Sequence, residues 1–184
     1  MKLYIMRHGK TDWNAVYKCQ GHTDIPLNDE GRRMAREAAE RYRSLEYDVC
    51  YCSPLVRAYE TARIVTEGRN VEIIKDDRLI EISLGKYEGS QNVMDKPDHP
   101  LYPFFMSPGT YVPLETTESF EEVAARGMDF IDHEIRPLSS KYKGILIVAH
   151  AVINKSIINS LQGIPKERFW EQPTKNCEII ELEI

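Results

Sequence analysis

Two histidines in this sequence each follow a run of apolar residues. His8 follows the strand-like run Lys2–Met6, and His150 follows Gly144–Ala149, a continuous apolar run typical of a central strand. Because ligands of open α/β sheets bind beyond the carboxyl ends of the strands, we expect both imidazoles at one edge of one sheet. Imidazoles at such an edge can exchange protons near neutral pH or attack an electrophile.

Two arginines are expected at the same edge. Arg7 adjoins His8, and Arg57 lies in the first turns of a helix that follows the second expected strand. Guanidinium groups match phosphate oxygens in bidentate fashion, so two of them beside two imidazoles would form a site for a dianion. Each residue alone is more often a surface charge or a structural histidine, and the prediction therefore depends on all four converging.

A sheet flanked by helices is needed to bring these side chains together. Strand-like segments alternate with segments of helical apolar spacing, which indicates an α/β fold with a mainly parallel central sheet. The expected strands are 2–6, 48–53, 71–75, 144–149 and 177–184. The expected helices follow the cap residue Asn28, run from Pro54 to about Glu67, run from Ser119 to about Pro137, and run from 151 to about Leu161.

Residues 92–114 break this alternation. Five prolines are interleaved there with Tyr102, Phe104, Phe105 and Tyr111. Prolines at this density exclude a regular helix or a central strand, whereas the aromatic residues argue against simple disorder. We therefore predict a single domain over residues 1–184 with a lid or insert at 92–114.

Composition narrows the class of partner. The chain has 184 residues, 24 Lys and Arg against 29 Asp and Glu, and a formal net charge of −5, which disfavours nucleic acid and anionic membranes as partners. No apolar run is long enough to span a bilayer, and Met1–Met6 reaches Arg7 too soon for a signal-peptide core. The four cysteines are scattered, without zinc spacing. We expect a cytoplasmic monomer or homodimer with reduced thiols, no metal and no cofactor.

The surroundings of these residues resemble the histidine phosphatase superfamily, the phosphoglycerate-mutase-like proteins. The matching blocks stand in family order along nearly the whole chain. They are Arg7–Asn14, Gln20–Leu27 with Gly31, Ser53–Ala62, Leu79–Glu81 with Gly85 and Glu88–Gly89, Thr117–Ser119 with Arg126, and Val148–His150. The resemblance implies a three-layer α/β/α sandwich and chemistry on a phosphoryl group.

The family's roles then apply residue by residue. The resemblance implies that His8 is the nucleophile, which attacks phosphorus as a neutral imidazole and forms a phosphohistidine. Arg7, Arg57 and His150 would hold the non-bridging oxygens and neutralise their charge. Asn14 and the backbone near Gln20 and Gly21 would complete this oxygen cradle.

The resemblance also implies a general acid, Glu81, which would protonate the leaving alkoxide and then activate the attacking water. A carboxylic acid in this role must hold a proton near neutral pH, and partial burial in a closed pocket favours that. Three other histidines, His22, His99 and His133, are expected outside this constellation.

Two positions depart from the usual family pattern. Lys10 stands where many relatives have an acidic or amide residue, which makes the mouth of the pocket more positive. Ala151 follows the second histidine where a glycine is usual, which adds a methyl group where the backbone approaches the phosphate. Neither change removes a catalytic group.

The resulting expectation is a metal-independent phosphomonoesterase that acts on a small phosphorylated metabolite. The first alternative is a cofactor-dependent phosphoglycerate mutase, which uses the same site as a phosphotransferase. Such mutases have a longer insertion and a tyrosine where this chain has Leu84. The second alternative is a non-catalytic phosphate-binding protein, against which the retention of all five catalytic residues argues.

Overall fold

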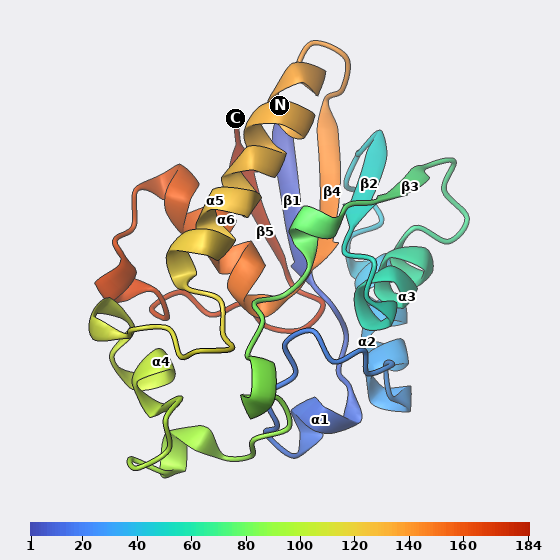
Figure 1. The fold of residues 1–184 in the computed structure, drawn as a ribbon. Coiled ribbons are helices and arrows are strands. Elements are labelled where there is room, and N and C mark those ends of the chain that lie inside the picture. Colours follow the sequence, from blue (N-terminus) through green and yellow to red (C-terminus); the bar gives the residue numbers. More distant parts are fainter.

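The computed structural model describes residues 1–184 and shows five strands in one sheet with helices on both faces (Figure 1). The strands are β1 (Lys2–Arg7), β2 (Val49–Cys52), β3 (Glu72–Lys75), β4 (Gly144–Ala149) and β5 (Ile179–Glu183). Their spatial order is β3-β2-β4-β1-β5. All neighbours pair in parallel except β5, which is antiparallel to β1. The predicted α/β/α fold with a mainly parallel sheet is confirmed.

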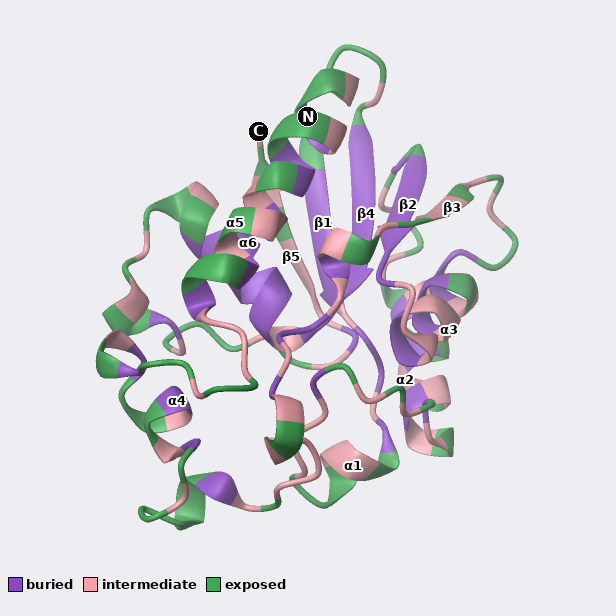
Figure 2. Ribbon diagram, in the orientation of Figure 1, coloured by how far each residue is buried: buried purple, intermediate pink, exposed green.

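The two strands that precede the predicted histidines lie next to each other. β1 and β4 pair in parallel with Lys2 opposite Gly144 and Arg7 opposite Ala149, so both strands end at the same edge of the sheet. All six residues of β4 are buried, as expected for an apolar strand covered on both faces (Figure 2). The register therefore places the residues after β1 and β4 side by side.

Six α-helices surround the sheet. They are α1 (Asp12–Ala15), α2 (Asp29–Arg41), α3 (Val56–Val65), α4 (Tyr102–Met106), α5 (Phe120–Phe130) and α6 (Ala151–Gln162). Asn28 caps α2 by accepting a hydrogen bond from the Gly31 N–H at 2.8 Å. Ser119 and Glu122 form the predicted capping box at the start of α5.

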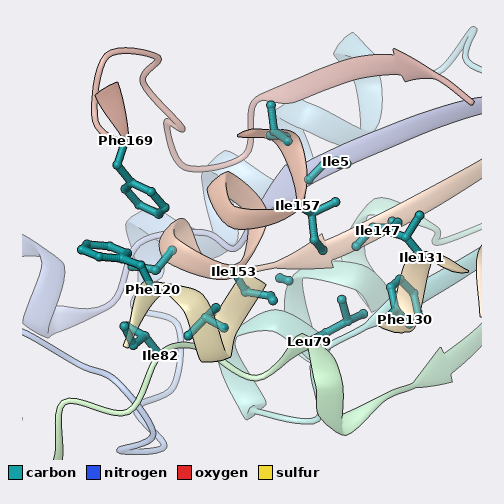
Figure 3. Close-up of a cluster of buried hydrophobic side chains, with 14 of the residues drawn as sticks. Ile5, Leu79, Ile82, Phe120, Phe130, Ile131, Ile147, Ile153, Ile157 and Phe169 are labelled. Atoms are coloured by element: carbon teal, nitrogen blue, oxygen red, sulfur yellow. The ribbon is translucent and has the colours of Figure 1, made fainter. Parts of the chain in front are cut away.

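The two faces of the sheet have different cores. On one face, Phe120 of α5 and Ile153 and Ile157 of α6 join a cluster of large aliphatic and aromatic side chains that includes Ile5 and Ile147 of the sheet (Figure 3). On the other face, α2 and α3 bring small residues close to the sheet, among them Ala35, Ala38 and Ala62. Cys50 and Cys52 both lie in this second cluster, as their strand spacing predicts, and both are free thiols.

The start of α3 differs from the sequence prediction. Pro54 was expected in the first turn, but the helix begins at Val56. Its cap residue is Leu55, whose side chain makes no capping hydrogen bond. The Val56 N–H instead donates to Asp24 Oδ1 at 2.8 Å. A carboxylate from a distant loop thus satisfies the exposed helix end, and the boundary moves two residues along the chain.

The helix expected from Ser119 to about Pro137 is not α-helical throughout. After α5 the chain continues as one wider π turn over Ile131–Ile135 and one 3₁₀ turn over Arg136–Leu138. Pro137 has no N–H to donate to the preceding turn, so the regular hydrogen-bond pattern cannot run through it.

Residues 92–114 are mostly irregular. The expectation that they contain no regular helix was wrong, because the short helix α4 lies within them. α4 spans five residues, and Pro103 lies in its first turn. N–H groups in the first turn have no partner within the helix, so proline, which has no N–H, costs no hydrogen bond there. The aromatic side chains anchor the segment, because Phe104 is buried and stacks on Phe120 with ring centroids 4.8 Å apart. Movement of this segment as a lid stays a prediction.

Candidate active site

His8 and His150 meet where β1 and β4 end. Their ring centroids are 5.1 Å apart, and both side chains are almost fully buried. The backbone N–H of His8 donates to the backbone carbonyl of Ala149 at 2.9 Å. This bond continues the β1–β4 ladder up to the two histidines. The predicted convergence of the imidazoles at one sheet edge is thus present in the structure.

The surroundings of His8 fix its tautomer and its charge. Nδ1 lies 2.6 Å from the Gly9 carbonyl, an acceptor, so Nδ1 carries the ring proton. Burial lowers the pKa of His8 well below its ordinary value, and the charges of Arg57 and Arg7 lower it further. Nε2, which makes no hydrogen bond, is therefore an unprotonated nitrogen with a free lone pair at neutral pH.

Thr61 holds the loop that carries His8. Its hydroxyl accepts a hydrogen bond from the Gly9 N–H at 3.0 Å and donates to the Arg57 carbonyl at 2.7 Å. A Cβ atom on Gly9 would lie 2.6 Å from the Gly31 carbonyl oxygen, so only glycine fits at this close approach. One buried hydroxyl thus joins the loop that carries His8 to helix α3.

Arg57 is fully buried and bonded on all three of its nitrogens. Nη1 donates to the Thr23 carbonyl at 2.9 Å, Nη2 to the Gly21 carbonyl at 2.7 Å, and Nε to His150 Nδ1 at 3.2 Å. Burial lowers the pKa of Arg57 to about 10, although the charges of Glu81, Asp24 and Glu88 oppose the shift. The guanidinium therefore remains a fixed positive charge at neutral pH.

The bonds of His150 determine which of its nitrogens carries the proton. Because Arg57 donates to Nδ1, the proton lies on Nε2, which donates to the hydroxyl of Ser53 at 2.8 Å. Burial lowers the pKa of His150 well below its ordinary value, and Arg57 lowers it further. His150 is therefore a neutral hydrogen-bond donor beside His8.

Arg7 has fewer partners than Arg57. Nη1 donates to the Thr174 carbonyl at 3.1 Å, and the buried Nε has no hydrogen-bond partner. Burial lowers the pKa of Arg7, and the nearby charge of Glu81 opposes that shift. Arg7 lines a cavity of about 540 Å³, so part of its donor set is available to a ligand.

Glu81 lies in the loop after the 3₁₀ turn Asp77–Leu79, and its carboxylate reaches the first turn of α6, which follows His150. Its side chain is buried, and its carboxylate accepts hydrogen bonds from the N–H groups of Ile82, Val152 and Ile153 at 3.0–3.1 Å. The predicted burial is present. These donors hold the carboxylate against the amino-terminal end of helix α6.

The remaining predicted residues lie in the segment that follows His8, Asn14 in helix α1 and Gln20 and Gly21 in the loop after it. Asn14 and Gln20 both bond the Thr11 hydroxyl, at 3.1–3.2 Å, and neither bonds a histidine or arginine of the site. The Gln20 and Gly21 N–H groups donate to no protein acceptor. The loop thus presents backbone donors, whereas the Asn14 side chain caps α1.

Several residues that position the site carried no assigned role in the sequence interpretation. Arg126 donates to the carbonyls of Ile80 at 2.5 Å and Glu81 at 3.0 Å and pairs with Glu118 at 3.0 Å, so it fixes the loop that holds Glu81. His22, expected outside the constellation, places Nε2 2.8 Å from the same Glu81 carbonyl. Arg126 and Glu118 lie in a sequence block that resembles the family, and that resemblance is the signal that could have identified them.

Glu88 braces the loop that carries Gly21. Its carboxylate accepts hydrogen bonds from the N–H groups of His22 and Thr23 at 2.9 and 2.8 Å. Gly21 has φ +56°, and a Cβ atom there would collide with the Glu88 side chain. The loop that receives the Arg57 guanidinium is therefore held from both sides.

No group of three or more His, Cys, Asp or Glu side chains is arranged to hold a metal ion, and no helix is long and apolar enough to cross a membrane.

Comparison with known proteins agrees with this geometry. The family model of the histidine phosphatase superfamily (branch 1) matches residues 3–184. Phosphoserine phosphatase 1 of Hydrogenobacter thermophilus is 32% identical over 172 residues, 92% of this chain and 80% of that protein. A probable phosphoglycerate mutase, GpmB of Enterobacter sp., is 28% identical over 185 residues, 100% of this chain and 85% of that protein.

The solved structure of Bacillus stearothermophilus YhfR superimposes with a TM-score of 0.87 at 30% identity, covering 100% of this chain and 91% of that one. The fold is therefore of the phosphoglycerate-mutase-like class. The chain belongs to the histidine phosphatase superfamily.

Proposed function

We propose that this protein is a metal-independent phosphomonoesterase that hydrolyses small phosphorylated metabolites through a phosphohistidine on His8. The observation that carries the proposal is the state of His8: a buried neutral imidazole whose Nδ1 proton is bonded to Gly9 and whose Nε2 is free. A neutral ring nitrogen beside two guanidiniums is suited to attack a phosphorus atom whose oxygens those guanidiniums hold.

The first step forms one bond and breaks one. The lone pair of His8 Nε2 attacks phosphorus in line, the P–O bond to the leaving group breaks, and the alkoxide departs with a proton. In the second step water attacks the phosphohistidine, the P–N bond breaks, and inorganic phosphate leaves. Glu81, which gave a proton to the leaving alkoxide in the first step, takes up the proton that water loses, and His8 returns to its neutral state.

The positive and hydrogen-bonding groups around His8 stabilise the negative charge on the phosphoryl oxygens. Arg57 is fixed before substrate arrives, because four protein contacts of the site, at Thr23, Gly21, His150 and Thr61, hold it in place. Arg7 supplies a second guanidinium with unused donors. His150 donates the hydrogen bond of its Nε2–H to a phosphoryl oxygen, which replaces the Ser53 hydroxyl as acceptor.

The loop after His8 completes the oxygen cradle in this proposal. The free N–H groups of Gln20 and Gly21 are backbone donors of the kind that bind anions. The Asn14 side chain would join them by exchanging its contacts with Thr11 for a phosphoryl oxygen.

Glu81 handles the protons in both steps. Its carboxylate, held by the N–H groups of α6, accepts a proton from the attacking water in the second step. In the first step, protonated Glu81 donates its proton to the leaving alkoxide.

Trapping the intermediate tests this proposal. Enzyme quenched during turnover of a ³²P-labelled phosphomonoester is expected to carry label that is lost in acid and retained in base, as for a phosphoramidate. Turnover is expected to continue unchanged in EDTA and to be inhibited competitively by vanadate, which mimics trigonal-bipyramidal phosphorus. Label with the opposite stability, or activity that EDTA abolishes and a divalent metal restores, would contradict the proposal.

The mutase alternative is favoured by the relatives named as probable phosphoglycerate mutases. It is tested with 3-phosphoglycerate, with and without 2,3-bisphosphoglycerate. A phosphatase releases inorganic phosphate or leaves the compound unchanged, whereas efficient formation of 2-phosphoglycerate would establish the mutase. The absence of any turnover, with phosphate still bound, would favour the binding protein. The cytoplasmic location and the choice between monomer and homodimer also stay predictions.

A further inference from the structure

A cavity of about 540 Å³ opens beside the proposed phosphoryl site. It begins at Arg7, next to His8, and at Ala151, next to His150, and so extends outward from the reacting groups. Four of its ten lining residues are basic and none is acidic, although the chain as a whole carries a net charge of −5. The four basic residues are Arg7, Lys10, Lys155 and Lys175.

Lys155, on helix α6, is the unusual member of this group. The residue is only 4% exposed, and its ammonium group forms no ion pair. Its one hydrogen bond is to the carbonyl of Gln172, so two of the three N–H donors have no protein acceptor. The ring of Trp170 lies 5.8 Å from Nζ and forms an apolar wall of the cavity.

A buried ammonium without a counter-charge is costly, and such groups are normally paired. Burial lowers the pKa of Lys155, and the positive charge of Arg7 lowers it further. Both effects would be offset by an anion in the cavity. The protein itself supplies no carboxylate there, since no acidic residue lines the cavity.

The other two lysines that line the cavity, Lys10 and Lys175, add to its positive charge. Lys10 is half-buried and forms no ion pair, and it is the position at which the sequence departs from the usual acidic or amide residue. Lys175 is more exposed and lies 3.5 Å from Glu178, so its charge is partly balanced. Lys155 and Lys10 are therefore the uncompensated charges beyond Arg7.

We propose that the substrate carries a second anionic group, a carboxylate or a further phosphate, which Lys155 and Lys10 bind while the first phosphoryl group occupies the site beside His8. The proposal rests on the proposed phosphatase function and narrows its substrate class from phosphomonoesters in general to phosphomonoesters of acids and bisphosphates. Lys155 and Lys10 determine specificity and take no part in the bond-breaking steps.

Matched pairs of substrates separate this second contact from the chemistry. 3-Phosphoglycerate and glycerol 3-phosphate share a leaving alkoxide and differ only in a carboxylate against a hydroxymethyl group. 6-Phosphogluconate and glucitol 6-phosphate differ in the same way over a longer skeleton. Glycerol 1,3-bisphosphate, corrected for its two equivalent phosphoryl groups, replaces the carboxylate with a phosphate.

The wild-type enzyme is expected to favour the doubly charged member of at least one pair by about tenfold or more in kcat/KM, the size of a charged hydrogen bond. Lys155→Met and Lys10→Gln are expected to bring that ratio toward one, and Lys10→Arg to preserve it. Lys143→Met removes an equal charge from an exposed site at the opposite end of β4 and is expected to leave the ratio unchanged. If Lys155→Met does not fold, the Lys10 variants carry the test.

Failure of this inference is distinguishable from failure of the proposed function. Ratios near one in every pair, with efficient hydrolysis of the singly charged members, would overturn the second anion site and leave the phosphatase intact. If no compound is hydrolysed, calorimetric titration of His8→Gln with the same pairs measures the second contact without turnover. Equal affinities within each pair in that titration would also overturn the inference.

Discussion

Arg57 and Arg7 belong to two adjoining regions that are built in different ways. Around Arg57, every nitrogen of the guanidinium and both ring nitrogens of His150 are bonded to the protein, and all these groups are buried. Around Arg7, the cavity is open, Arg7 Nε has no partner, and Lys155 has unused donors.

The difference follows from what each region binds. A phosphoryl group is the same in every substrate, so donors fixed in advance lower the cost of organising the transition state. The rest of the substrate varies, and side chains with unused donors can meet different groups there. We therefore expect the closed region to determine the reaction and the open region to determine which phosphomonoester reacts. The following predictions test that division.

The largest effect is expected from removing the nucleophile. His8→Ala should lower kcat by at least about 10⁴-fold on every substrate, because no other side chain in the closed region has a free nitrogen facing the phosphoryl site. Steady-state rates and the amount of trapped phosphoenzyme measure this, with circular dichroism to show that the fold persists. Residual labelling at the wild-type level would assign the nucleophile to another residue.

The next largest effect is expected from Glu81→Gln, which keeps the shape of the side chain but cannot transfer a proton. Loss of general acid catalysis should slow alkyl phosphates by about 10²–10⁴-fold. With p-nitrophenyl phosphate, whose leaving group needs no proton, the burst of the first step should be reduced much less. Equal slowing of both bursts would show that Glu81 only holds the loop and α6 together.

A smaller effect is expected from Thr61→Val, which removes the hydroxyl that joins Gly9 to Arg57. It leaves the buried Gly9 N–H without an acceptor, which costs about 1–3 kcal/mol of unfolding free energy. Urea denaturation measures this, and kcat should fall along with it. Thr61→Ser should restore both.

The matched control for Thr61 is Thr66→Val, since the buried Thr66 hydroxyl bonds only the Ala62 carbonyl within α3. This control should change kcat little, because it does not reach the His8 loop. A loss of activity in Thr66→Val as large as in Thr61→Val would mean that α3 stability, rather than the Gly9 contact, controls the site.

The last effect is on stability alone and concerns the dependence of the unfolding free energy on pH. The pKa values of His8 and His150 are lowered in the folded protein, so below about pH 6.5 the unfolded chain binds protons that the folded chain does not. Stability should therefore be complete above pH 6.5 and fall between pH 6.5 and 5, by up to about 1.4 kcal/mol per pH unit for each histidine.

Denaturation of His8→Gln over the same pH range tests this assignment, and the slope should be about half that of the wild-type protein. His133→Gln is the control, because it removes a histidine whose side chain is 75% exposed in the folded protein. An unchanged slope in His8→Gln would show that other groups cause the pH dependence.

The sequence by itself determined the parts of the fold that depend on neighbours in the chain. The apolar run Gly144–Ala149 became β4 with the predicted bounds, and Asn28 and the Ser119–Glu122 pair cap the helices they precede. These signals are local, since burial pattern and end caps are set within a few residues. The sequence also placed His8 and His150 at one edge, because parallel strands end together.

Only the tertiary structure decided the features that depend on distant partners. Asp24 sets the start of α3, Ser53 and Arg57 set the tautomer of His150, and the N-terminus of α6 holds the Glu81 carboxylate. Nothing in the sequence pattern marked Lys155 as a buried cation facing a cavity. Its position on α6 is local, but its surroundings come from Arg7, Trp170 and the segment around Gln172. Such surroundings form only when separate elements pack together, because local spacing does not encode which distant groups will meet.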